Sequence, residues 1–293
     1  MRVLLTGREG QLGRALVAAC PPQLELIACG RADIDLEDPA ACRAAVQRHA
    51  PHWLINAAAY TAVDRAESEP SLAMAVNAGG PVALAEALAE RGGRMLQIST
   101  DFVFSGDQGH PYQPHQPAAP LSAYGRSKAA AEQGLQAVLA DDRLCILRTG
   151  WLYGPLGTNF LLTMLRLHRA RAAAGQPLRV VADQVGCPTT TADLARTCWA
   201  AVERNLCGIH HWSNAGAASW YDFAMAIGEI SCAMGLLERA AIVEPISTAD
   251  YPTPARRPSY SLLDCQTTRR ALGLQQQHWR AALADVIAEL VAP

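Results

Sequence analysis

The chain has 293 residues and a formal net charge of −2, and half of its residues are hydrophobic. This composition excludes a disordered chain, and the lack of basic runs argues against a nucleic-acid partner. We expect no transmembrane helix and no signal peptide, and nine scattered cysteines without a Cys-x-x-Cys pair favour a reducing cytoplasm.

A strand, a glycine turn and a helix open the chain. The β-rich run 2–6 leads into Gly7-Arg-Glu-Gly10-Gln-Leu-Gly13, and residues 14–20 have helical character. Glycines in such a turn let the backbone approach a pyrophosphate, and the N–H groups of the helix N-terminus face the anion. We therefore predict a dinucleotide site here; a glycine-rich surface turn is the alternative.

The second predicted strand, 24–29, ends in Gly30 and Arg31. An acidic residue at this position would bind both ribose hydroxyls of NAD, whereas a glycine leaves room for a 2′-phosphate and an arginine can pair with it. We predict NADPH as the cofactor. NADH is the alternative, with Arg31 then a solvated loop residue. Asp35 and Leu36 are expected near the adenine.

Strands and helices alternate through the first half of the chain. A third apolar strand, 52–56, precedes a helix at 74–90, which leads to a strand ending at Thr100. This pattern predicts an α/β fold, a Rossmann-type doubly wound parallel sheet with its site at the C-terminal strand edge. We expect a dinucleotide-binding domain at 1–150, joined by about 179–212. A smaller substrate-binding domain, 151–178 and 213–293, is then built partly from insertions.

Tyr124 and Lys128 are the candidate catalytic pair. They are four residues apart in a predicted helix, 123–139, so their side chains share one face. An ammonium beside a phenol is expected to lower the phenol's pKa and make it a proton donor. Thr100, at the end of its strand, could bond the same substrate oxygen. A solvated lysine beside a half-buried tyrosine is the alternative.

Three features of the second half bear on the site. The proline-rich stretch 107–120 predicts a mobile loop over the site. Trp151 follows a strand at 143–148, where it either stacks on a ring or wedges into the core. Arg256 and Arg257 lie among prolines, which predicts a stiff cationic loop suited to a diphosphate.

With these motifs placed, the chain resembles the dTDP-4-dehydrorhamnose reductases of the extended short-chain dehydrogenase group, nearly from end to end. The Gly-x-x-Gly-x-x-Gly spacing is typical of that group. Six further blocks carry the resemblance: 56–70, 99–104, Tyr124-x-x-x-Lys128, 148–153, 183–189 and 251–258.

The resemblance implies reduction of dTDP-4-dehydro-L-rhamnose to dTDP-L-rhamnose. In that reaction Tyr124 would act as general acid, Lys128 would lower its pKa and bind the nicotinamide ribose, and Thr100 would bond the substrate oxygen. Asp101 and Trp151 match substrate-contacting positions of the family, and we add Arg256 from its loop. Positions that match cofactor contacts are Gln11, Leu12, Ala59, Tyr60 and Thr61.

Alternative functions remain open at this point. One is a reductase of another nucleotide 4-ketosugar. A nucleotide-sugar dehydratase would carry Thr-Asp-Glu, but Phe102 stands in place of the acid. A non-catalytic relative, the regulatory subunit of methionine adenosyltransferase, binds NADP and a partner protein. The resemblance alone raises Mg²⁺, for which the sequence shows no ligand cluster, and a homodimer is compatible with it.

Overall fold

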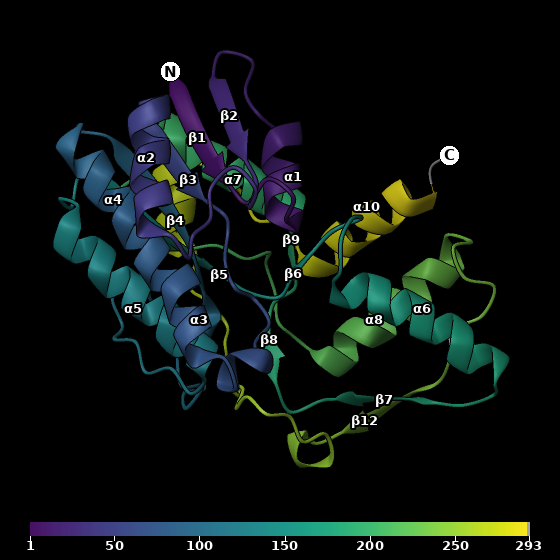
Figure 1. The fold of residues 1–293 in the computed structure, drawn as a ribbon. Helices are drawn as coiled ribbons and strands as arrows, with labels where there is room; N and C mark the ends of the chain where they lie inside the picture. Colours follow the sequence, from purple (N-terminus) through teal and green to yellow (C-terminus); the bar gives the residue numbers. More distant parts are fainter. Residues whose placement is uncertain (292–293) are drawn as a thin grey trace.

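The computed structural model describes residues 1–291 and is organised around a six-stranded parallel sheet (Figure 1). The strand order is β2-β1-β3-β4-β5-β10, so the direction of winding reverses between β1 and β3. In open sheets of this kind, ligands bind beyond the carboxyl ends of the strands at that reversal. The strands are β1 Arg2–Thr6, β2 Glu25–Cys29, β3 Trp53–Asn56, β4 Arg94–Thr100, β5 Leu144–Thr149 and β10 Gly208–His211.

Helices cover both faces of the sheet, because successive apolar residues of each strand point to opposite sides. Leu4 packs under the layer of α2 Pro39–His49, α4 Gly80–Glu90 and α5 Ala123–Val138. Its neighbours Val3 and Leu5 pack under α1 Gln11–Ala18 and α7 Thr191–Glu203. A short helix, α9 Gln266–Leu272, lies against α7 and β10. The predicted doubly wound fold is confirmed.

The segment Pro70–Glu90 is long and apolar enough to cross a membrane by length and composition. In the structure it comprises α3 Pro70–Met74, a widened helical turn Ala75–Gly79, and α4. Of its apolar 18-residue window, 56 % is buried inside the protein, and α4 packs between α2 and α5. Its apolar character is therefore that of a core helix.

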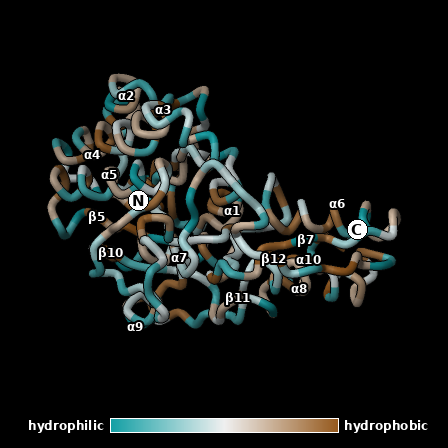
Figure 2. Tube along the Cα trace, turned by 90° about the horizontal axis from the view of Figure 1, so that it is seen from below, coloured by the Kyte–Doolittle hydropathy of each residue, from teal (hydrophilic) through white to brown (hydrophobic). Residues whose placement is uncertain are grey.

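A smaller lobe extends to one side of the sheet (Figures 1 and 2). It is built from α6 Phe160–Ala173, α8 Trp220–Ala233, α10 Trp279–Val291 and the strand pair β7 Leu178–Val181 with β12 Val243–Ile246. These elements share one hydrophobic core. The strand at 178–181 thus belongs to the smaller lobe. Residues from about 179 onward were expected in the dinucleotide-binding domain, so the predicted boundary lies too early in the chain.

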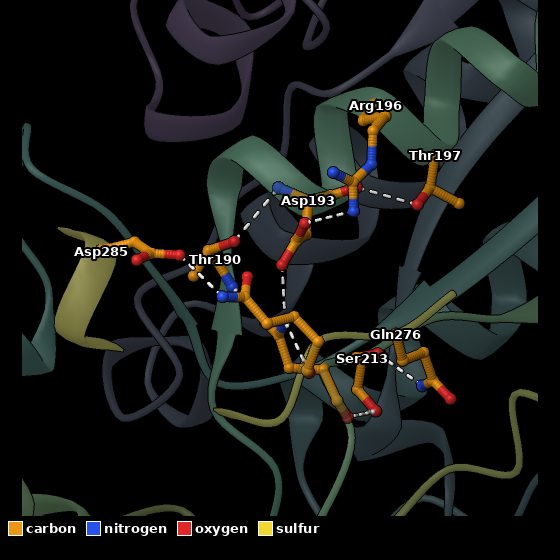
Figure 3. Close-up of polar contacts among 9 residues, drawn as sticks. Thr190, Asp193, Arg196, Thr197, Ser213, Gln276 and Asp285 are labelled. Carbon is orange, nitrogen blue, oxygen red and sulfur yellow. Dashed lines mark hydrogen bonds and ion pairs between the residues drawn. The ribbon is translucent and has the colours of Figure 1, made fainter. Parts of the chain in front are cut away.

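Short strands and polar contacts join the two lobes. β6 Leu152–Tyr153 pairs with β9 Thr189–Thr190, and β8 Val185–Gly186 pairs with β11 Ala218–Ser219. Figure 3 shows the start of α7, which follows β9; here the Thr190 hydroxyl caps the helix and accepts from the Asp193 N–H at 3.1 Å. Nearby, Gln276 Nε2 donates to the Ser213 carbonyl at 2.6 Å. Single helical turns complete the chain at Arg65–Glu67, Asp101–Val103 and Thr248–Asp250.

Candidate active site

A cleft of about 770 Å³ opens at the carboxyl ends of the central strands, where the winding of the sheet reverses. Residues that follow β1, β3, β4 and β5 line it, together with Tyr124 and Lys128 of α5. Of the site residues predicted from the sequence, Gly13 and Arg256 lie outside the lining, and all the others belong to it. The sequence motifs therefore converge on one cavity.

Only glycine fits two positions of the turn after β1. Gly7 has a φ of +80°, and a Cβ on Gly13 would lie 2.0 Å from the Gly7 carbonyl oxygen. Gly10 begins α1 without a side chain, so no side chain caps the first N–H groups of this helix. Such uncapped N–H groups at a close-packed glycine turn suit the pyrophosphate of a dinucleotide.

Acidic side chains surround the end of β2. The Glu9 carboxylate lies over Gly30, where an added Cβ would be 2.0 Å from Oε1. Arg31 lines the cleft but pairs with Glu37 at 2.6 Å, and Asp33 accepts from the Gly30 N–H at 2.8 Å. Sequence reasoning missed Glu9, which lies between the motif glycines, and Glu37, which follows the predicted adenine residues Asp35 and Leu36.

The helix that carries Tyr124 and Lys128 starts at the cleft. Ser122 is its N-cap, and the hydroxyl accepts from the Gly125 N–H at 3.1 Å. Lys128 is buried and donates to the Ile98 carbonyl at 2.7 Å. Tyr124 is half-buried with the Thr100 hydroxyl beside its phenol. All three predicted catalytic side chains thus meet at the end of β4.

The acid–base properties of this group differ from the expectation. Burial raises the pKa of Tyr124 to about 12, although the Thr100 hydroxyl opposes the shift. Burial lowers the pKa of Lys128 to about 8, and Glu132 opposes that shift. The prediction that Lys128 lowers the Tyr124 pKa is therefore wrong for this structure. Tyr124 keeps its proton at neutral pH, and Lys128 titrates near the physiological range.

Asp101 is a buried carboxyl in the cleft wall, only 2 % exposed. Burial raises its pKa to about 6, while the hydroxyls of Ser261 and Thr100 hold it lower than burial alone would. Gly150 makes room for it, since a Cβ there would lie 2.6 Å from Asp101 Cγ. A carboxyl with this pKa changes charge just below neutral pH, so Asp101 is a titratable group of the site.

Trp151 stacks on another indole. Its ring is parallel to that of Trp220, with centroids 3.5 Å apart and 1° between the planes. Trp220 Nε1 donates to Gln184 Oε1 at 3.2 Å, and Trp151 has a left-handed backbone with a φ of +51°. Both lobes therefore hold Trp151 in the cleft wall, with one face of the ring covered.

The two arginines of the predicted cationic loop have separate places. Arg257 pairs with Asp64 at 2.8 Å, and the Ala255 N–H donates to the same carboxylate at 3.2 Å. Arg256 is exposed and lies outside the cleft lining. Its predicted contact with a diphosphate is thus not part of the cavity as it stands.

The proline-rich stretch 107–120 does not cover the site. Within the described chain, none of its residues lines the cleft. Tyr112 stacks on Phe104 with ring centroids 4.1 Å apart and its N–H donates to the Leu262 carbonyl at 2.8 Å. The predicted loop over the site is wrong: an aromatic core pins this segment beside β10 and the C-terminal region.

Asn77 supports the cleft from behind, and sequence reasoning gave it no role. Its Oδ1 accepts from the Tyr60 N–H at 2.7 Å, and its Nδ2 donates to the Ser127 hydroxyl at 2.9 Å. It lies in the widened turn before α4, a geometry that is frequent at functional sites. A buried amide in an otherwise apolar helical run was the available signal.

No metal site accompanies these residues. Between residues 1 and 291, no group of three His, Cys, Asp or Glu side chains lies close enough together to hold an ion. The magnesium ion that the resemblance raised has no support in this arrangement.

Comparisons with known proteins agree with the geometry. The family model described as the RmlD substrate binding domain matches residues 1–292. A dTDP-4-dehydrorhamnose reductase of Sinorhizobium fredii is 40 % identical, over 98 % of this chain and 97 % of its own. A dTDP-4-keto-6-deoxy-D-glucose reductase of Streptomyces niveus is 38 % identical, over 97 % of this chain and 96 % of its own.

Among solved structures, a dTDP-4-dehydrorhamnose reductase of Bacillus anthracis in complex with NADP superposes with a TM-score of 0.91. It is 36 % identical, and the match covers 98 % of this chain and 99 % of that one. The likeness therefore extends over both lobes.

Proposed function

The chain belongs to the family of the RmlD substrate binding domain, and on that premise we propose that it reduces the 4-keto group of dTDP-4-dehydro-L-rhamnose to give dTDP-L-rhamnose, with NADPH as reductant. The observation that carries the proposal is the union, in one cleft, of a glycine cradle with Thr100, Tyr124 and Lys128. A reductase needs these two parts within reach of each other, because the hydride and the proton arrive at adjacent atoms of one carbonyl group.

The cofactor assignment is supported by the turn at Gly7 and Gly10 and by a similar structure that contains NADP. When bound, the nicotinamide supplies the hydride that adds to C4. In this proposal the N–H groups at the start of α1 bind the pyrophosphate, and Lys128 binds the nicotinamide ribose.

Tyr124 supplies the proton. As hydride adds to C4, the electron pair of the C=O π bond moves to oxygen, and the resulting alkoxide takes the phenolic proton. A pKa of about 12 keeps this proton in place until the alkoxide forms. The Thr100 hydroxyl donates to the same oxygen and stabilises the growing charge. Solvent then returns a proton to the phenolate.

Two further groups are assigned to the sugar nucleotide. Asp101 and Trp151 lie in the cleft wall beside the catalytic residues and are proposed to contact the sugar. Arg256, exposed on a loop at the edge of the smaller lobe, is proposed to meet the diphosphate when the substrate binds.

A second candidate is reduction of a different dTDP-4-keto sugar, which the name of the Streptomyces niveus relative favours. The test is NADPH oxidation with dTDP-4-dehydrorhamnose beside other dTDP-4-keto sugars, compared by kcat/KM. The highest value for dTDP-4-dehydrorhamnose supports the proposal, and a higher value for another sugar replaces it. A protein that binds NADPH but reduces none of them would instead be a non-catalytic relative.

We also propose a cytoplasmic location, supported by nine cysteines that are all free thiols. A homodimer stays a prediction, which light scattering of the purified protein would test.

A further inference from the structure

A buried ion pair lies directly behind the cleft. Glu132 of α5 and Arg148 of β5 have side chains only 5 % and 3 % exposed, and neither lines the cavity. Arg148 donates from Nη2 to Oε2 at 2.6 Å and from Nε to Oε1 at 2.9 Å. Buried ion pairs add little net stability, because desolvation offsets the attraction. Net stability therefore does not explain why an ion pair lies at this position.

Each partner of the pair makes a further contact. Glu132 Oε1 accepts from the Ser99 hydroxyl at 2.5 Å, and Arg148 Nη1 donates to the Pro114 carbonyl at 3.1 Å. Burial, reinforced by Arg148, lowers the pKa of His211 to about 3, so the imidazole is neutral. It lies 3.0 Å from the Tyr112 carbonyl through Nδ1 and 3.4 Å from Arg148 Nη1 through Nε2.

The pair lies one residue row before Thr100 in the register of the sheet. Ser99, Arg148 and His211 are in register on β4, β5 and β10, and the next row is Thr100 beside Thr149. On the helix, Glu132 lies one turn beyond Lys128 and two turns beyond Tyr124. One carboxylate thus connects the helix that carries the proton donor to the strand that carries Thr100.

We propose that Glu132 and Arg148 are positioning residues, which fix α5 on β4 and β5 so that Tyr124 and Lys128 stand beside Thr100 in the cleft. A slide of α5 along the sheet would break the two-point contact with Arg148 and the Ser99 hydrogen bond together. The expected loss of hydride-transfer rate rests on the proposed reduction. The expected loosening of α5 rests on the hydrogen bonds alone.

The electrostatics support the same role. Burial of Lys128 disfavours its ammonium form, and the Glu132 charge raises its pKa in opposition. Arg148 in turn pairs with that carboxylate at 2.6 Å. The pair therefore supports both the position and the charge of the lysine.

The decisive variant replaces both charges. Single substitutions would leave an unpaired buried charge, which destabilises any protein, whereas a double apolar replacement of a buried pair is commonly tolerated. The test variant is Glu132→Leu with Arg148→Met. The control carries the same two replacements, Glu86→Leu with Arg43→Met, in an exposed ion pair between the neighbouring helices α4 and α2.

Two measurements separate positioning from stability. In single turnover with saturating NADPH, we expect the test variant to lose about 10- to 100-fold in hydride-transfer rate, with NADPH affinity within about threefold. Amide hydrogen exchange over residues 123–138 should speed up by about tenfold without a comparable change in α2. The control variant should match the unmodified protein in rate.

The outcomes are distinct. Unchanged rate and unchanged exchange in a folded test variant overturn the positioning role. If the unmodified protein reduces no 4-keto sugar, the proposed function is refuted. Faster exchange in α5 of the test variant would still support the positioning role in that case. If the double variant does not fold, Arg148→Lys decides, because it keeps the charge but not the two-point contact. A rate at least about fivefold lower with unchanged NADPH affinity supports the role, and a smaller loss overturns it.

Discussion

Asp64 and Arg257 are 193 residues apart in the chain, yet Arg257 Nη2 lies 2.8 Å from Asp64 Oδ2. Burial alone would raise the Asp64 pKa, but hydrogen bonds from Arg257 and the Ala255 N–H lower it below its usual range. Two of the sequence blocks that carry the family resemblance, 56–70 and 251–258, therefore meet in space. Their contact fixes the loop that carries Arg256 beside the residues that follow β3.

Arg256→Ala is expected to raise the KM for the sugar nucleotide more than it lowers kcat. A diphosphate is remote from C4, so its contacts are alike in the ground and transition states. Steady-state kinetics over a range of substrate concentrations measure the effect. Arg166→Ala, an exposed arginine of α6, is the control. An unchanged KM in a normally folded variant would mean that Arg256 does not bind substrate.

Tyr124→Phe should abolish most of the reduction while NADPH still binds. General acid catalysis contributes about 10²- to 10⁴-fold, and the phenylalanine ring keeps the packing against Phe102. Single-turnover hydride transfer at saturating NADPH gives the rate. Tyr221→Phe, in the smaller lobe, should leave it unchanged. More than about a tenth of the original rate in the Tyr124 variant would assign the proton to another donor.

The activity should decline as pH rises through about 8. Lys128 has a pKa of about 8 in this structure because it is buried, so the free protein loses the ammonium above that pH. Tyr124, with a pKa of about 12, does not titrate in the same range. The profile of kcat/KM reports groups of the free enzyme, and it should show one alkaline limb. A flat profile up to about pH 9.5 would show that the charge on Lys128 is not needed.

Asp101→Asn is expected to stabilise the protein at neutral pH. The folded-state pKa of about 6 exceeds the usual 3.8, so the folded protein holds this proton more tightly than the unfolded chain. Asp101 therefore lowers stability progressively as pH rises from about 4 to about 6 and fully above that. The gain in the variant is at most roughly 3 kcal/mol.

Denaturant unfolding at several pH values measures the effect of Asp101→Asn. The stability difference should be present at about pH 7.5 and vanish near pH 4. Asp107→Asn, at an exposed position, is the control. A variant that is equally stable or less stable at neutral pH would mean that hydrogen bonds to the carboxylate outweigh its desolvation. If the variant is more stable, as expected, Asp101 costs stability and is retained for its role in the site.

Arg31 should favour NADPH over NADH by a modest factor. A guanidinium can bind the 2′-phosphate in a charge-assisted contact, but Glu37 already pairs with it at 2.6 Å. We expect Arg31→Ala to weaken NADPH binding by about tenfold and leave NADH binding unchanged. Glu37→Gln should tighten NADPH binding. Titration of the cofactor-free protein with each nucleotide decides, and tighter binding of NADH by the unmodified protein would contradict the assignment.

The features of the site that depend on local geometry could be predicted from the sequence. The glycine turn at 7–13 and the spacing of Tyr124 and Lys128 depend on backbone conformation over a few residues, and both motifs are found at the cleft. The alternation of strands and helices likewise predicted the parallel sheet. Residue spacing predicts which side chains share a face, because helices and strands each repeat at a known period.

The errors concern contacts between distant segments. The spacing from Tyr124 to Lys128 shows neither how far the folded chain buries the phenol nor that Lys128 donates to the Ile98 carbonyl. Burial raises the pKa of Tyr124, so the predicted direction of the shift was wrong. The prolines of 107–120 indicate a loop, but only the stacking of Tyr112 on Phe104 shows where that loop lies. The strand at 178–181 pairs with one 65 residues later, and nothing in either segment alone names its partner.

The order in which the sheet is completed has a consequence for synthesis on the ribosome. β10 pairs with β5, and α7 covers α1 through a contact in which Trp199 Nε1 donates to the Leu16 carbonyl at 3.0 Å. Both late elements emerge only after α6 and β7 of the smaller lobe have been synthesised. A nascent chain that ends near residue 150 therefore exposes a strand edge on β5 and the apolar face of α1. We expect such truncated chains to aggregate or to recruit chaperones, and the nucleotide-binding half to become stable only once residue 211 is free of the exit tunnel.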